Sequence, residues 1–89
     1  MTIGGNPKKM ARDISEGYTS LNRAGLKKYT VGDLKTIKAN LETVLREIRS
    51  EQLDLDDQQA IKNKNMRMSR INQTMIVINS YAKRRRLPI

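Results

Sequence analysis

The chain has 89 residues, which is room for one domain and not for two. It carries 18 Lys and Arg residues against 9 Asp and Glu residues, and the resulting net charge of +9 favours an acidic or polyanionic partner. Cys and His are both absent, which excludes disulfides, Cys-ligated zinc or iron–sulfur clusters and the commonest general base. These absences favour a protein that is not an enzyme and that uses no metal and no cofactor.

The apolar content is modest for a chain of this size. Hydrophobic residues make up 37% of the sequence, with no Phe, no Trp and only 3 Tyr. Such a core is close to the margin of stability, so association with a second copy is a natural remedy. The longest apolar run, 75–78, is too short to span a membrane, and residues 1–7 lack the apolar segment of a secretory signal. The sequence therefore predicts a cytoplasmic protein.

The first predicted helix covers residues 7–25 and follows a flexible tail over residues 1–6. Asn6 is a good N-cap, and Pro7 suits the first helical position, where its missing N–H costs nothing. Gly25 is the predicted end, because glycine readily adopts the left-handed conformation that closes many helices. The apolar residues that would share one helix face recur at spacings of four, four and three: Met10, Ile14, Tyr18 and Leu21.

The second predicted helix covers residues 30–52. Thr30 and Asp33 have the spacing of a capping box, in which each side chain accepts a hydrogen bond from the other residue's backbone. Apolar residues then alternate by three and four positions, and Leu45 widens the stripe that they form. The seam of this helix consists of Leu34, Ile37, Leu41, Val44 and Ile48.

The third predicted helix covers residues 56–86. Asp56 and Gln59 suggest a second capping box, and the turn before it is short, which makes the second and third helices antiparallel neighbours. Its main apolar seam consists of Ile61, Met68, Ile71, Met75, Ile78 and Ala82. The predicted fold is all-α: an antiparallel, coiled-coil-like helical hairpin with an additional N-terminal helix.

The third predicted helix has a second apolar stripe, formed by Met66, Val77 and Tyr81. Asn65, Asn72 and Asn79 recur at intervals of seven, where amides can hydrogen-bond across an interface and fix its register. Apolar residues on two sides of one helix favour partners on both sides. We therefore expect a homodimeric helical bundle; the alternative is that the amides form a polar edge without a role.

The positive charge is concentrated in the last third of the sequence. Residues 58–89 hold eight basic groups and no acidic one, residues 30–57 have a net charge of −3, and residues 1–29 have a net charge of +4. The alternative to a binding surface is a set of solvated faces, partly balanced by the acidic middle segment. The candidate phosphate-binding residues are Lys62, Lys64, Arg67, Arg70, Lys83, Arg84, Arg85 and Arg86, together with Lys8, Lys9 and Arg12.

These features predict a small accessory or regulatory protein that binds nucleic acid mainly through the phosphate backbone. Because aromatic residues for base stacking are few, duplex or structured nucleic acid is favoured over single strands. The alternative is an adaptor or assembly subunit that docks on another protein through the second apolar stripe. The high charge supports the first hypothesis and the stripe supports the second.

Overall fold

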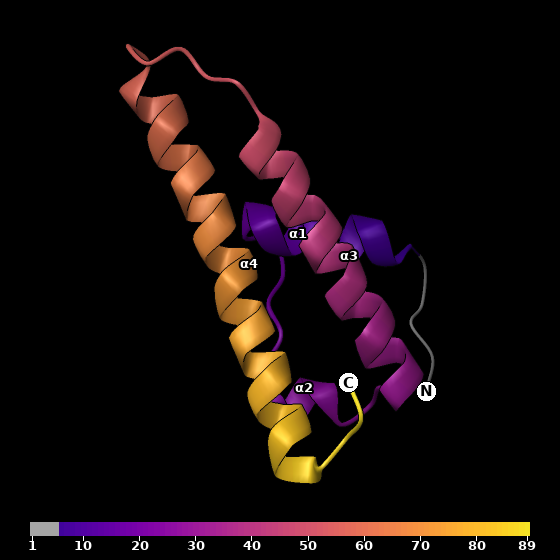
Figure 1. Ribbon diagram of the computed structural model, residues 1–89. Helices are drawn as coiled ribbons and strands as arrows, with labels where there is room; N and C mark the ends of the chain where they lie inside the picture. Colours follow the sequence, from indigo (N-terminus) through magenta and orange to yellow (C-terminus); the bar gives the residue numbers. More distant parts are fainter. Residues whose placement is uncertain (1–5) are drawn as a thin grey trace.

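The computed structural model describes residues 6–89, and this part of the chain contains four helices and no strand. The two long helices lie antiparallel, the first helix crosses both, and the short second helix packs against the C-terminal part of the last one (Figure 1). The predicted all-helical class is confirmed. The helices are α1 (Pro7–Glu16), α2 (Arg23–Leu26), α3 (Val31–Ser50) and α4 (Gln58–Arg85).

Helix α3 supplies the largest share of the core and begins as predicted. Its capping box is present: the Asp33 N–H donates to Thr30 Oγ1 and the Thr30 N–H donates to Asp33 Oδ2, both at 3.1 Å. The predicted seam is confirmed, because all of its residues are buried together with Leu45. The other three helices each add fewer residues to the same hydrophobic cluster: Ala11, Ile14, Leu26, Ile71, Ile78 and Tyr81.

The prediction of one helix over residues 7–25 is wrong. Helix α1 ends at Glu16 because Gly17 adopts a left-handed conformation, with φ at 81°. The Gly17 N–H donates to the Ile14 carbonyl at 3.1 Å, and the Tyr18 N–H donates to the Asp13 carbonyl at 2.9 Å. Tyr18 therefore lies beyond the helix and is 79% exposed instead of continuing its buried face.

The segment after α1 forms a separate short helix. Asn22 accepts a hydrogen bond from the Gly25 N–H at 2.7 Å and so caps α2. Gly25, the predicted end of the first helix, instead lies inside α2. This local cap starts a second helix, which places Leu26 in the core with none of its surface exposed.

Helix α4 begins one residue later than the predicted cap implies. Asp57, rather than Asp56, is the N-cap and accepts a hydrogen bond from the Ala60 N–H at 3.0 Å. Asp54 Oδ1 accepts from the Asp56 N–H at 2.9 Å, which commits Asp56 to the preceding turn. The helix still covers nearly all of the predicted span, since Asp57 directly follows the predicted cap.

The ends of the described chain are fixed by local contacts. Asn6 caps α1 as predicted, accepting from the Lys8 N–H at 2.9 Å; the rest of the predicted tail, residues 1–5, lies outside the described residues. After α4 the chain folds back, and Leu87 and Ile89 pack against the core. No helix within residues 6–89 is long and apolar enough to cross a membrane.

Candidate functional site

The predicted N-terminal basic residues are used to hold α1 in place. Lys8 Nζ lies 2.8 Å from one oxygen of Glu47, and Arg12 Nη2 lies 3.5 Å from the other. Hydrogen bonding from Lys8, with the positive charges of Lys8 and Arg12, lowers the pKa of Glu47 below its ordinary value. Lys9 pairs with Asp13 one turn further along α1, at 3.0 Å. These cations attach α1 to α3 or pair within α1.

Two predicted phosphate-binding residues of α4 close the C-terminal end of α3. Lys64 Nζ donates to the Glu51 carbonyl at 2.8 Å and to the Arg49 carbonyl at 3.2 Å, carbonyls that have no partner within the helix. Arg67 forms a two-pronged ion pair with the Glu51 carboxylate, with N–O distances of 2.7 and 2.9 Å. This hydrogen bonding lowers the pKa of Glu51 and raises that of Arg67. Both cations therefore serve the α3–α4 contact.

Arg70 contacts the C-terminal end of α1. Its Nη1 donates to the Ser15 carbonyl at 3.0 Å, and its guanidinium lies beside Gly17. A cation at this position interacts favourably with the negative end of the helix dipole. Lys8, Lys9, Arg12, Lys64, Arg67 and Arg70, six of the eleven predicted phosphate-binding residues, thus have partners within the chain.

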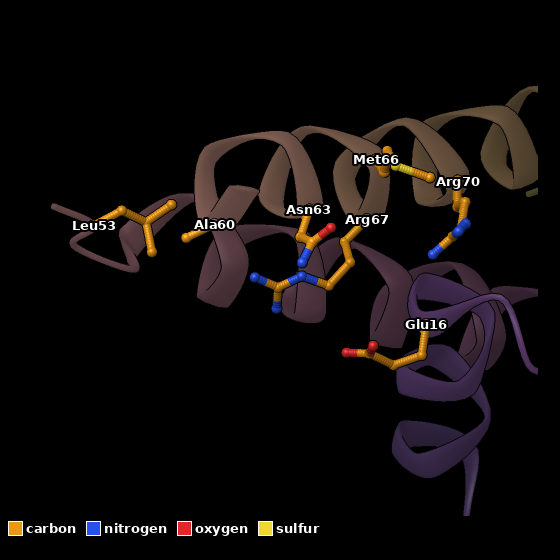
Figure 2. A pocket seen from close by; sticks show the side chains of 7 residues that line it. All are labelled: Glu16, Leu53, Ala60, Asn63, Met66, Arg67 and Arg70. Carbon is orange, nitrogen blue, oxygen red and sulfur yellow. The ribbon is translucent and has the colours of Figure 1, made fainter. Parts of the chain in front are cut away.

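The hollow of about 440 Å³ beside α4 belongs to this set of internal contacts. Figure 2 shows the Glu16 carboxylate and the Arg67 guanidinium facing it from α1 and α4. Positive and negative groups line it together, so it offers no field of one sign to an anion. Within the described chain, no group of three or more acidic side chains is close enough to hold a metal ion.

The remaining five predicted residues are exposed on α4 and at its C-terminal end. None of them forms an ion pair within residues 6–89: Lys62, Lys83, Arg84, Arg85 and Arg86. The Arg85 guanidinium lies over the Tyr81 ring, 5.2 Å from its centroid. Four of these five residues, all except Lys62, therefore lie together at the C-terminal end of α4.

Helix α2 adds two further cations to this end. Arg23 and Lys27 line a cleft of about 380 Å³ together with Arg84 and Arg85. Ala24 and Tyr81 complete the lining, and no carboxylate takes part. We call this site the basic cleft. Arg23 and Lys27 could not be identified from the sequence, because only the packing of α2 on α4 brings them to residues nearly sixty positions away.

Some residues of the predicted oligomer interface are buried within the chain, and others are exposed. Tyr81 is 8% exposed and Val77 packs against the core, so residues of the same chain cover most of the second apolar stripe. Met66 remains 42% exposed, and the three asparagines at intervals of seven, Asn65, Asn72 and Asn79, lie on the solvent side of α4. Ile76, which sequence analysis did not single out, is 58% exposed among them.

Comparison with protein-family models, with curated proteins and with solved structures found no match. Among the described residues, the fold and the site define an all-helical basic protein. Its distinguishing feature is a cleft lined by four cationic side chains at one end of the α2–α4 contact.

Proposed function

We propose that this protein is a non-enzymatic nucleic-acid-binding protein that contacts the phosphate backbone with the basic cleft and its rim. The cleft itself is the observation that supports the proposal: four cations from two helices with no carboxylate beside them. Lys83 and Arg86, which are exposed next to it, extend the positive surface. Such a surface neutralises phosphates without reading base sequence.

The aromatic residues favour duplex or structured nucleic acid as the ligand. Base stacking needs an open ring face, but Tyr81 is nearly buried and Arg85 covers its ring. Tyr29 is half-buried in the core, which leaves Tyr18 as the one well exposed tyrosine of residues 6–89. Phosphate contacts, which a duplex offers in regular array, would therefore supply most of the affinity.

The test is the salt dependence of binding to a labelled random duplex, followed by fluorescence anisotropy. The logarithm of the association constant should fall linearly with log salt, with a slope near −0.9 per phosphate contacted. Replacing Arg84, Arg85 and Arg86 by Ala should make the slope shallower by about two to three units. The control replaces Arg46, Arg49 and Lys62, exposed cations away from the cleft, and should change the slope less.

The absence of binding at low ionic strength would contradict the proposal. A protein that docks on another protein through apolar contacts would instead keep its partner at high salt and in the triple Arg variant. This comparison separates the two functions that the sequence leaves open.

A second proposal is that two copies associate through the outer face of α4. It is supported by the 58% exposure of Ile76, which lies on the same face of α4 as the asparagines at heptad spacing. An apolar side chain in the middle of a row of amides is the arrangement that buries one contact and fixes its register. The same face is the candidate dock if the partner is a different protein.

A further inference from the structure

The cations of the basic cleft converge on one hollow. Arg23 and Lys27 come from α2 and its C-terminal cap, while Arg84 and Arg85 lie in the last turn of α4. Four like charges that surround about 380 Å³ repel one another, and no carboxylate in the lining offsets this repulsion. An anion that entered the cleft would interact with all four charges together, which distinguishes the cleft from a merely solvated basic face.

One guanidinium of the cleft is held by a contact with the core. Tyr81 is fixed by the core, at 8% exposure, and the Arg85 guanidinium lies over its ring at 5.2 Å. This contact restricts the guanidinium, and its N–H groups remain able to donate to an anion. This fork matches the spacing of two phosphate oxygens, so less side-chain freedom is lost when a phosphate binds.

Size and charge indicate which phosphate fits. A phosphate in the middle of a duplex strand is joined to the strand on both sides, so it can contact the mouth of the cleft and its rim, at Lys83 and Arg86, without entering the hollow. A phosphate at the end of a strand can enter the hollow. It carries a charge of about −1.5 to −2 and three terminal oxygens, whereas an internal phosphodiester carries a single charge. Four converging cations therefore suit the terminal group better than the internal one.

We propose that the basic cleft is a binding site for a phosphomonoester, and specifically for the terminal phosphate of a nucleic-acid strand. This inference rests on the proposed function, because that function identifies nucleic acid as the source of the phosphate. The rim contacts the backbone next to the terminal phosphate. It assigns Arg23, Lys27, Arg84 and Arg85 as the residues that bind the terminal phosphate.

The experiment compares two duplexes of one sequence, with 5′-phosphate or 5′-hydroxyl ends and the label on an internal base. Near physiological salt, where contacts of exposed charges are screened, the wild type should bind the phosphorylated duplex at least about tenfold more tightly. Lys27→Ala combined with Arg84→Ala, one residue from each wall, should remove the difference. Arg46→Ala combined with Arg49→Ala removes the same number of charges outside the cleft and should preserve it.

Equal affinity of the wild type for both duplexes overturns the terminal-phosphate site and leaves the proposed function intact. Loss of the difference in the control variant as well would also overturn it, because the preference would then follow net charge and not the cleft. Circular dichroism of both variants establishes that they remain folded, which the exposure of the four replaced side chains favours.

If neither duplex binds, the proposed function fails, and a second measurement tests whether the cleft binds phosphate. Inorganic phosphate, compared with sodium chloride at equal ionic strength, should raise the melting temperature of the wild type by several degrees and that of the cleft variant much less. This result would support a phosphomonoester site supplied from another source. The absence of a phosphate-specific increase in the wild type overturns the site.

Discussion

Arg86 shows how a single residue directs the end of the chain. It has a left-handed conformation with φ at 55°, which lets the Leu87 N–H donate to the Ala82 carbonyl at 2.8 Å. Gly17 makes the same kind of turn after α1. For a residue with a Cβ atom this conformation costs about 1–2 kcal/mol. Glycine at position 86 would therefore make the fold more stable, but the sequence has a cation there, next to the basic cleft.

We predict that Arg86→Gly increases stability by about 1 kcal/mol, because glycine adopts φ above zero without steric cost. For a domain of this size the melting temperature should rise by about 4–8 °C, measured by circular dichroism. Arg86→Ala removes the same charge but keeps a Cβ atom and is the control. Equal melting temperatures for the two variants would show that loss of charge, and not relief of the backbone, explains any gain.

At the scale of the elements, the break between α1 and α2 creates the site. A continuous helix over residues 7–25 would extend away from the end of α4, whereas the turn at Gly17 lets α2 pack there (Figure 1). Arg70 stabilises that turn from α4, through its hydrogen bond to the Ser15 carbonyl. Arg23 and Lys27 reach the basic cleft only because of this break.

We predict that Gly17→Ala destabilises the fold by about 1–2 kcal/mol, the cost of a left-handed residue with a side chain. The new Cβ would also lie 3.1 Å from Arg70 Cζ, so the guanidinium must shift. Gly32→Ala is the control: Gly32 lies in α3, a Cβ there has ordinary contact at 3.8 Å, and the change should stabilise by up to about 1 kcal/mol. Urea denaturation measures both. A neutral Gly17→Ala variant would contradict the position of the break.

At the scale of the whole molecule, opposite ends have different charge environments. The chain extends 45 × 25 × 19 Å, with the α3–α4 connection at one end and the α2–α4 contact at the other (Figure 1). Near the first end the basic residues Lys64 and Arg67 pair with groups of the same chain. At the second end Arg84 and Arg85 face the basic cleft without a carboxylate. The second end therefore presents a cluster of positive charge that the chain itself does not neutralise within the cleft.

We predict that the protein forms a homodimer through the outer face of α4. If two copies associate through α4, light scattering at micromolar concentration should give twice the chain mass of 10.2 kDa. Ile76→Asp should give monomers that remain folded, because Ile76 is 58% exposed in the single chain and its replacement leaves the core intact. Gln59→Asp, an exposed change near the start of α4, should remain dimeric. A wild type of 10.2 kDa would contradict the homodimer and leave the outer face to a different partner.

The sequence by itself determined the features that depend on neighbouring residues. The capping box of Thr30 and Asp33 and the buried seam of α3 were predicted correctly, because capping and a period of 3.6 residues act within one or two turns. The end of the first helix was predicted wrongly. Gly17 and Gly25 could each close a helix, and the neighbouring residues do not distinguish between them. The two carboxylates Asp56 and Asp57 posed the same choice for the start of α4.

Only the tertiary structure decided which charges are paired within the chain. Lys8, Arg67 and Arg70 look like Arg84 in the sequence, but the first three lie against a carboxylate or a helix end of another element. Ion pairs and carbonyl contacts between distant segments depend on how the helices cross, and no local spacing encodes that. The packing of α2 on α4 likewise added Arg23 and Lys27 to the candidate site, because a cleft exists only where two elements meet.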